Sequence, residues 1–565
     1  MRKLYAFAVA ALVPAALYAQ SPFDAYQISQ SDLKGTARFM GMAGAFGALG
    51  GDLSTLSQNP AGIGVYRSSE VGFTLDLDCQ QASATAQGFK TTKDQTRFYL
   101  NNIGGVATLR LGGALRNLNI GFTYNKAASF ERRYAGGIPS LPYSLSNYIA
   151  GVASTNHVTE ADVKTTSSFD PYNPNDGGYA APWITILGYD SYLIDPEGTG
   201  QNTEWYGQFG DGTQGSGVFQ VNEKGHLDEY NIAIGGNFND KVFWGMNFDI
   251  VSMDYRIQSV WGENLTDAYV YDPTRGNVAR MDARWALRDK FRLNGTGFNY
   301  QLGVIVKPIQ ELRIGFAFHT PTWYNLTETF YNERVDYDYP FNNGKGYAVT
   351  NNGDPNTNEL RFQSPWKLIA SVAGVIGSKF IVSMDYEWNQ YEKMKFSNAD
   401  SYNYFDPYDP WDPWQPWNAK QKLPGAPYSY NDDPIGYTND KISTISKNTS
   451  TIRIGAEYRV IPEFSVRVGY SYTSSPVTSK AKDNLEGIPG AGVMTNYRLD
   501  NSTNYITAGV GYRHKGFYID AAYVWKHISS EYYPFSPDTA DPLTVANSKL
   551  SLNNSQVVLS MGYKF

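Results

Sequence analysis

Several stretches of the chain alternate strictly between apolar and polar residues. In the last ten residues, QVVLSMGYKF, Val558 alone breaks the alternation, and the odd positions are all apolar or aromatic: Val557, Leu559, Met561, Tyr563 and Phe565. The same period recurs in TIRIGAEYRV, residues 451–460. Successive side chains of a β-strand point to opposite faces, so each stretch predicts a strand with one apolar face and one polar face.

Marking every such run predicts fourteen strands: 69–79, 98–111, 117–132, 226–239, 241–257, 287–306, 310–322, 363–376, 378–396, 448–460, 463–475, 500–513, 515–529 and 551–565. The connections between them alternate between a few residues and tens of residues. Outer-membrane barrels have an even number of strands, short periplasmic turns and longer extracellular loops. The sequence therefore predicts an all-β fold, a transmembrane antiparallel β-barrel of about 14 strands, with both termini in the periplasm.

The composition agrees with a barrel in a membrane. The chain holds 43 Tyr, 29 Phe and 12 Trp, and outer-membrane barrels place such residues in girdles at the two bilayer interfaces. A mean hydropathy of -0.41 is compatible with a membrane barrel, because apolar and polar residues alternate along each strand and cancel in the mean. After residue 20 no uncharged apolar run approaches the length of a membrane-spanning helix, which excludes a helical membrane protein. A net charge of -7 disfavours nucleic acid as a partner.

The two ends of the chain predict export and assembly. Arg2 and Lys3 precede an apolar run, and Ala19 stands at a plausible cleavage point, so residues 1–19 read as a secretory signal peptide. The lone Cys79 provides neither an intrachain disulfide nor a lipid anchor. The C-terminal Phe565 resembles the signal that barrel-assembly machinery reads. We therefore expect a bacterial outer-membrane location, with that machinery and outer-membrane lipid as partners.

A glycine-rich segment, MGMAGAFGALGGDLSTLSQNPAGIG, precedes the first predicted strand at residues 40–64. It contains no Gly-Lys-Ser or Gly-Lys-Thr, which excludes a Walker loop, and its glycines recur every third residue, unlike a dinucleotide-binding fingerprint. Small residues at this spacing let the backbone pack closely against neighbours. We expect residues 20–66 to form a plug, or hatch, inside a barrel of residues 67–565.

The sequence contains no complete catalytic motif. The sequence has no G-x-S-x-G, and its five histidines are scattered, so we expect no enzyme, no catalytic residues, no metal site and no cofactor.

Four segments together resemble the FadL/TodX family of outer-membrane transporters of hydrophobic molecules: ARFMGMAGAFGALGGDLSTLSQNPAGIG, GTGFNYQLGVIVKPIQELRIGFAFHTP, FIVSMDYEWNQY and IRIGAEYRVIPEFSVRVGYSYTSSPV. The resemblance implies a fourteen-stranded barrel closed by an N-terminal hatch. It also implies passive, ligand-gated uptake, with exit sideways into the membrane through an opening at a kink in the third strand. The expected hatch and gating residues are Gly41, Gly44, Gly47, Asn59, Pro60, Ala61 and Gly62. Long-chain fatty acids are the family's default substrate, and aromatic hydrocarbons or haem remain open.

Two long connections, near 133–225 and 397–447, are expected outside the cell. The second contains YNYFDPYDPWDPWQPWN, whose rings Tyr408, Trp411, Trp414 and Trp417 either stack on a ligand or pack on one another over the barrel mouth. Its aspartates Asp406, Asp409 and Asp412 suggest calcium, but each precedes a proline and no glycine turn or distal glutamate completes a known loop.

Charged residues on the inward face have two interpretations. Arg313, Asp385, Glu387, Arg453, Glu457 and Arg467 form either a ladder of salt bridges between wall and hatch or, through an arginine such as Arg313 or Arg453, a site for a ligand carboxylate. His319 is either a hydrogen-bonded wall residue or a haem ligand. A purely adhesive surface barrel is the rival to a transporter, because long aromatic loops suit contact with proteins or glycans. An adhesin has little use for a plug.

Overall fold

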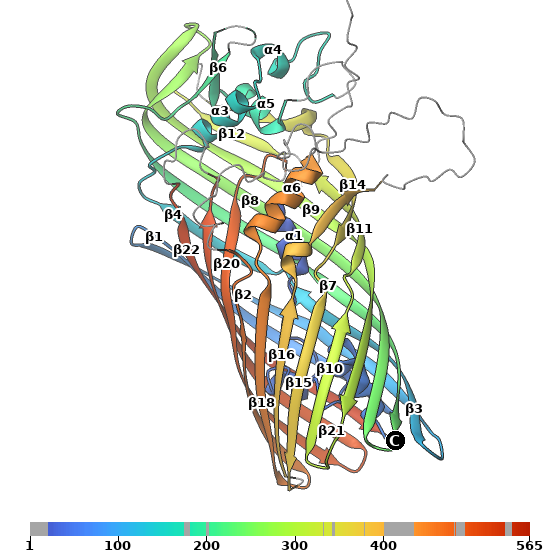
Figure 1. Ribbon diagram of the computed structural model, residues 1–565. Helices are drawn as coiled ribbons and strands as arrows, with labels where there is room; N and C mark the ends of the chain where they lie inside the picture. Colours follow the sequence, from blue (N-terminus) through green and yellow to red (C-terminus); the bar gives the residue numbers. More distant parts are fainter. Residues whose placement is uncertain are drawn as a thin grey trace, which may run out of the picture.

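Long antiparallel strands form the wall of the molecule (Figure 1). The computed structural model describes residues 21–173, 181–198, 200, 203–331, 333–341, 345–377, 379–399, 434–478, 481, 492–536 and 545–565. The predicted signal peptide, residues 1–19, lies outside the described residues. So do the aromatic residues Tyr408, Trp411, Trp414 and Trp417 and the aspartates Asp406, Asp409 and Asp412.

Within the described residues, fourteen strands close into a barrel, which confirms the predicted fold. They are β1 Glu70–Ala86, β2 Phe89–Arg110, β3 Leu115–Ser129, β7 Gln214–Phe238, β8 Val242–Asp272, β9 Asn277–Val306, β10 Leu312–His319, β15 Lys367–Ile376, β16 Phe380–Asn389, β18 Thr449–Ile461, β19 Phe464–Thr473, β20 Tyr497–His514, β21 Phe517–Tyr533 and β22 Ser548–Lys564. The pairing of β1 with β22, for example Phe73 with Met561, closes the circle.

Shorter elements extend the wall at the rim opposite the C-terminus (Figure 1). The strands are β4 Arg132–Ile138, β11 Trp323–Phe330, β12 Arg334–Asp338, β13 Lys345–Val349, β14 Asn356–Gln363 and β17 Lys395–Asn398. A separate pair, β5 Ile194–Glu197 and β6 Glu204–Gly207, packs with the helices of the first long connection: α3 Leu145–Thr155, α4 Glu160–Val163 and α5 Trp183–Asp190. The remaining pieces at this rim are η4 Thr350–Gly353, η5 Tyr391–Lys393 and α6 Pro434–Ile445.

Some strands run further than the sequence predicted. The ladder of β1 and β2 continues to Ala86 and Phe89, where Gln87 and Gly88 form a tight turn with φ values of 49° and 85°. Likewise, β8 and β9 pair up to Asp272 and Asn277, and β4 and β7 occupy both ends of the segment 133–225. Beyond the lipid the outward residues need not be apolar, so the alternation that marks a membrane-spanning strand is lost there.

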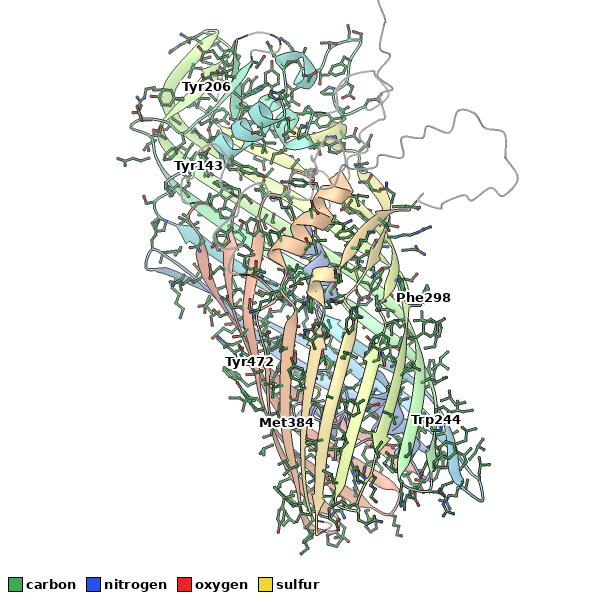
Figure 2. All side chains as sticks on the ribbon, viewed as in Figure 1. Tyr143, Tyr206, Trp244, Phe298, Met384 and Tyr472 are labelled. Carbon is green, nitrogen blue, oxygen red and sulfur yellow. The ribbon has the colours of Figure 1, made fainter. Side chains whose placement is uncertain are left out.

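The outer face of the wall carries a belt of apolar side chains. Figure 2 shows Phe298, Met384 and Tyr472 on this face, and each has about two-fifths of its surface exposed, at 44%, 42% and 38%. So many large apolar side chains on one continuous surface indicate contact with lipid. In the described part of the chain, no helix is long and apolar enough to cross a membrane.

The N-terminal segment, residues 21–66, lies within the circle of strands (Figure 1). It contains α1 Pro22–Ser29, α2 Ala37–Gly41 and two 3-10 helices, η1 Leu53–Ser57 and η2 Pro60–Val65. Most of its side chains are buried against the inner face of the wall. On the side of α1, the interior is filled by a large apolar cluster that includes Phe130, Trp261, Trp285, Tyr532 and Phe535.

Candidate functional site

Asp385 of β16 holds the glycine-rich part of the N-terminal segment. Its Oδ2 atom accepts hydrogen bonds from the backbone N–H groups of Phe46 and Gly47, at 3.0 and 2.9 Å, and from the side-chain amide of Gln58 at 3.0 Å. The Gln58 amide also donates to the Gly44 carbonyl at 2.7 Å. All these groups are buried, so each bond replaces one that water would have made. A single carboxylate therefore ties two turns of the segment to the wall.

Glycines of the wall let the segment approach the strand backbones. A Cβ on Gly303 would lie 2.0 Å from Asn59 Oδ1, and one on Gly315 would lie 2.4 Å from the Gly47 carbonyl oxygen. Likewise, a Cβ on Gly245 would lie 2.1 Å from the carbonyl oxygen of Pro60. Sequence reasoning missed these wall glycines. Their signal is an inward glycine between two outward apolar residues, as in LGV at 302–304 and IGF at 314–316.

The predicted hatch residues make the bends of the segment. Gly41 accepts a hydrogen bond from Thr507 Oγ1 at 3.0 Å, and Gly44 has a φ of +74°, which glycine adopts without steric cost. Asn59 donates to the Gly47 carbonyl at 2.6 Å and caps η2 by accepting from the Ala61 N–H. Pro60 occupies the first turn of η2, where its missing N–H is no loss. At Gly62 a Cβ would lie 2.5 Å from Thr55 Oγ1.

Of the residues predicted to bind a ligand, Trp411, Trp414 and Trp417 lie outside the described residues, and Arg313, His319 and Arg453 each contact protein groups. Arg313 Nη1 donates to the Leu49 carbonyl at 2.5 Å, and His319 Nε2 donates to the Gln58 carbonyl at 2.8 Å. Arg453 pairs with Glu387 at 2.8 Å. The structure therefore places Arg313 and His319 against the N-terminal segment and joins Arg453 to a neighbouring strand.

Other inward charges form a ladder that includes the segment. Arg38 of α2 pairs with Glu457 of β18 at 3.0 Å, and Arg467 of β19 contacts both Glu457 at 2.7 Å and Asp520 at 2.6 Å. All four side chains are buried or nearly so. Pairing of this kind is what buried charges require.

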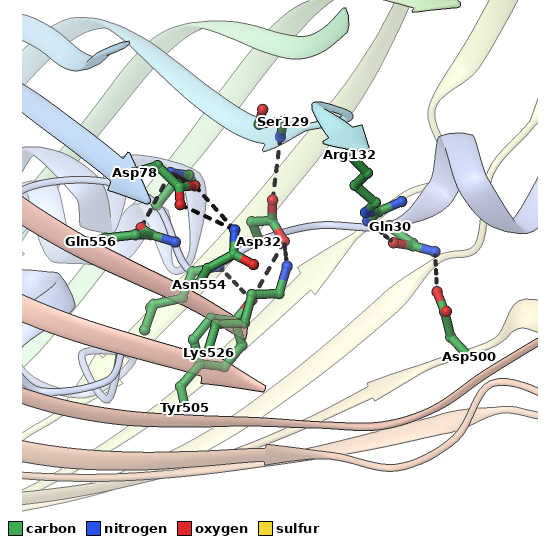
Figure 3. Close-up of polar contacts among 12 residues, drawn as sticks. Gln30, Asp32, Asp78, Ser129, Arg132, Asp500, Tyr505, Lys526, Asn554 and Gln556 are labelled. Carbon is green, nitrogen blue, oxygen red and sulfur yellow. Dashed lines mark hydrogen bonds and ion pairs between the residues drawn. The ribbon is translucent and has the colours of Figure 1, made fainter. Parts of the chain in front are cut away.

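A second set of charges lies where the segment leaves α1 (Figure 3). Asp32 forms an ion pair with Lys526 of β21, and it accepts a hydrogen bond from the Ser129 N–H at 3.2 Å. Lys34 contacts Asp76 of β1 at 2.5 Å. Burial acts to raise the pKa of Asp32, but the ammonium groups of Lys526 and Lys34 outweigh it and lower that pKa to about 2. Asp32 is therefore ionised while the segment is docked.

Two arginines hold α1, and sequence reasoning missed both. Arg132 and Arg498 each donate to the side-chain oxygen of Gln27, at 3.1 and 3.0 Å, and each pairs with Glu223. Beside them is a cavity of about 30 Å³ that Asp24 lines. Burial raises the pKa of Asp24 to about 7, although a backbone hydrogen bond at Ser21 opposes the shift.

The wall is interrupted beside this segment. The backbone ladder between β2 and β3 ends at Asn102 and Asn125, and above that pair, among the described residues, the backbone of β2 pairs only with that of β1. The register between β3 and β7 shifts between Lys126 and Ala128. Across the interruption, the hydroxyls of Tyr99 and Ser129 lie 2.9 Å apart. The segment adjoins the same place, because the Asp32 N–H donates to the Ala127 carbonyl at 2.9 Å.

Residues 226–565 match the family described as outer membrane protein transport protein (OMPP1/FadL/TodX). The chain belongs to this family. Members of the OMPP1/FadL/TodX family are outer-membrane transport channels, so this protein is a channel for hydrophobic compounds and not an enzyme. The barrel and its apolar belt agree with that assignment.

Several solved structures are similar to the chain over most of its length. A Pseudomonas aeruginosa FadL homologue is 11% identical with a TM-score of 0.49, over 95% of this chain and 99% of that one. The P. putida toluene transporter TodX is 12% identical with a TM-score of 0.46, over 94% and 99%. The Ralstonia pickettii toluene transporter TbuX is 13% identical with a TM-score of 0.43, again over 94% and 99%. No curated protein sequence matches the chain.

This OMPP1/FadL/TodX-family protein also has a cleft of about 1320 Å³ at its far rim, between α3, β6 and the tips of β8 and β9. Rings line it, including Tyr143 and Tyr206 (Figure 2). Burial raises the pKa of Asp190 and that of Asp195 to about 6, with help from neighbouring carboxylates. Among the described residues, no group of three or more His, Cys, Asp or Glu side chains is arranged to hold a metal ion.

Proposed function

We propose that this outer-membrane channel takes up hydrophobic small molecules passively, with long-chain fatty acids as the substrate class and lateral exit through the barrel wall. Residues 21–66 act as the plug that a ligand must displace, with Gly41, Gly44, Gly47, Asn59, Pro60, Ala61 and Gly62 as its bends. Residues 1–19 direct export, and the barrel-assembly machinery recognises Phe565.

The observation that carries the proposal is the interruption of the wall next to the N-terminal segment. Above Asn102 and Asn125, no backbone ladder joins β2 to β3 in the described chain. Only side chains bridge this gap, such as the hydroxyls of Tyr99 and Ser129. Side-chain contacts open at lower cost than a ladder of backbone hydrogen bonds. Because Asp32 bonds to both Ala127 and Ser129, a shift of the segment disturbs the edge of the gap.

The small cavity beside α1 supports a gated mechanism. Ligand pockets usually enclose about 300–1,000 Å³, whereas this cavity has about 30 Å³, room for a water or two. A fatty acid therefore enters only if α1 moves. When α1 leaves, Arg132 and Arg498 each lose the contact with Gln27. A ligand carboxylate then replaces that contact with a charge-assisted hydrogen bond.

An uncharged aromatic hydrocarbon is the second candidate substrate. The large cleft at the far rim is lined by rings together with Glu160, Asp190, Asp195 and Glu197, and Lys164 is the one basic residue among its lining residues in the described chain. Lys164 pairs with Glu160 at 2.9 Å. This negative lining disfavours a carboxylate and favours an uncharged ring compound. Fatty acids and aromatic hydrocarbons therefore belong in the same assay.

The test is mass spectrometry of organic extracts from the full-length protein, purified in mild detergent, beside a variant that lacks residues 21–62. We expect a long-chain acid or another hydrophobic small molecule in the intact protein and less of it in the variant. If both preparations hold only bulk lipid, the channel has no lumenal ligand site and a surface-interaction barrel becomes the better account.

A further inference from the structure

Basic side chains follow the outward face of β9 above the apolar belt. Arg292, Lys290 and Arg288 occupy alternate positions of the strand and point away from the lumen. The next two outward residues, Asn294 and Thr296, are polar, and from Phe298 downward the outward residues are apolar or aromatic. Figure 2 shows Phe298 on the outer surface. The outward face of this strand therefore changes from lipid-facing to cationic within a few residues.

Neighbouring strands continue the basic surface sideways. Lys224 of β7 stands opposite Arg256 of β8, and Arg256 stands opposite Arg292 of β9. One step higher along the strands, Arg288 stands opposite Arg334 of β12. We call this surface the basic patch, and its members are Lys224, Arg256, Arg288, Lys290, Arg292 and Arg334.

The carboxylates within the patch do not balance its charge. Asp254 is shared by Arg256 and Arg292, at 2.7 and 3.0 Å. Asp336 is shared by Arg288 and Arg334. In the described chain, Lys224 and Lys290 make no salt bridge, and Lys290 lies over the ring of Tyr331 at 4.7 Å. The patch thus keeps a positive charge in a protein whose net charge is -7.

Like charges that face each other across strands destabilise a sheet. In the row Lys224, Arg256 and Arg292, an anion bound from outside would remove this repulsion. Arginine forks match the geometry of phosphate and bind it in a bidentate manner. Both observations favour an anionic partner, phosphate among them, over a neutral surface.

The height of the patch above the apolar belt indicates which kind of lipid it contacts. Tyr230, Ile250, Phe298 and Trp323 form one row across the strands at the upper edge of the apolar belt. Lys224 is six residues above Tyr230, and Arg292 is six above Phe298. At about 3.3 Å per residue and a strand tilt of about 40°, this places the row roughly 15 Å above the belt. The headgroup zone of a phospholipid is only about 5–8 Å deep.

We propose that the basic patch binds the phosphate groups of a glycolipid of the outer leaflet, one whose saccharide headgroup carries phosphate well above the acyl chains. The acyl chains would lie on the apolar belt below the patch. This interaction is separate from substrate transport and requires no movement of the N-terminal segment.

The full-length protein in phosphatidylcholine nanodiscs, doped with an acylated disaccharide whose attached outer sugars carry phosphate, provides the test. Native mass spectrometry counts the glycolipid retained by each barrel. The patch variant carries Lys224→Glu, Arg256→Glu and Lys290→Glu. The matched control reverses three basic residues on β2 and β22, away from the patch: Lys90→Glu, Lys93→Glu and Lys549→Glu.

We expect the patch variant to bind the glycolipid about a hundredfold more weakly, and the control to bind it as the wild type does. Equal retention by the patch variant and the wild type would overturn the proposal. So would equal binding of the dephosphorylated glycolipid, or equally effective displacement by phosphatidylglycerol, because either result would show that phosphate on the saccharide is not recognised.

Displacement by inorganic phosphate and a series of neutral substitutions complete the test. Inorganic phosphate should displace the glycolipid only weakly, since the lipid is also held by its acyl chains. Full displacement would point to a free-phosphate site and would contradict the proposal. If the charge reversals prevent barrel assembly, the neutral series Lys224→Gln, Arg256→Gln and Lys290→Gln gives the same comparison, with a smaller loss expected and no loss as the contradicting result.

Discussion

Gly303 of β9 and Asn59 of the N-terminal segment approach so closely that a Cβ atom on Gly303 would lie 2.0 Å from Asn59 Oδ1. The same Asn59 donates to the Gly47 carbonyl and accepts from the Ala61 N–H, so its side chain is held on both sides. A residue larger than glycine at position 303 must therefore displace the segment or the strand.

Gly303→Ala should loosen the N-terminal segment and raise the basal conductance of the channel in planar bilayers. Overpacking in a close-packed interior costs about 1–3 kcal/mol, enough to shift a docked segment. Gly374→Ala on β15 is the control, because nothing lies within 4 Å of a Cβ there. Equal conductance of the two variants would contradict a tight contact between Gly303 and Asn59.

Asp385→Asn should increase hydrogen exchange at residues 44–50. The amide loses the charge that strengthens the bonds from the Phe46 and Gly47 N–H groups, and a bond to a neutral acceptor contributes about 1 kcal/mol less than one to a charged acceptor. Ser383→Ala, two residues away on β16, removes a hydroxyl that bonds only to its neighbouring strand, at Val372, among the described residues. Exchange mass spectrometry should show faster exchange in the first variant and unchanged exchange in the second.

The docking of α1 should weaken as the pH rises from about 4 to about 7. Burial raises the pKa of Asp24 to about 7 in the docked state, so docking favours the protonated acid. The protonated acid therefore stabilises docking fully at a pH below the pKa that Asp24 has when the segment is unfolded. This stabilisation is lost as the pH rises through about 7, the pKa in the docked state. Asp24→Asn should remove the dependence and slow exchange in Phe23–Ile28 at about pH 8. A variant with the same pH profile as the wild type would assign the effect to another group.

Asp32 should give the opposite dependence. Its pKa of about 2 is below the ordinary value, so its pairing with Lys526 stabilises docking above about pH 4 and is lost as the pH falls from about 4 to about 2. Asp32→Asn should lose this contribution already at neutral pH, seen as faster proteolysis of residues 21–66. Unchanged proteolysis would mean that the pair does not hold the segment.

The membrane-embedded wall could be predicted from sequence because lipid imposes one physical demand on every strand. Outward residues such as Leu302 and Val304 must be apolar, whatever lies inside the barrel. Above the belt that demand ends. The upper parts of β1 and β2 carry small or polar residues on both faces, such as Gln80, Ala82 and Lys90, and their pairing was not visible in the pattern.

The candidate site was less predictable. Glycines in the segment at residues 40–64 indicated close packing, but their partners come from strands hundreds of residues away, as with Gly47 and Asp385. Arg313 and His319 were correctly expected on the inward face, yet only the structure shows that the carbonyls of Leu49 and Gln58 accept their hydrogen bonds. An inward glycine such as Gly303 was the signal that could have been used, because a strand facing an open lumen has no need of one.

If ligand leaves sideways through the gap between β2 and β3, closing that gap with a crosslink stops uptake. The measurement is uptake of a labelled long-chain fatty acid, with a labelled monoaromatic hydrocarbon in parallel, by cells that produce cysteine variants. Tyr99→Cys with Ser129→Cys spans the gap, and Leu109→Cys with Leu118→Cys joins an outward pair where the ladder is intact. Both carry Cys79→Ser, because the native Cys79 is exposed and would react.

A short, reducible thiol crosslinker is applied to both variants. We predict that crosslinking positions 99 and 129 stops uptake, that reductant restores it, and that crosslinking positions 109 and 118 changes nothing. Normal uptake with the upper crosslink fully formed would contradict lateral exit through this gap.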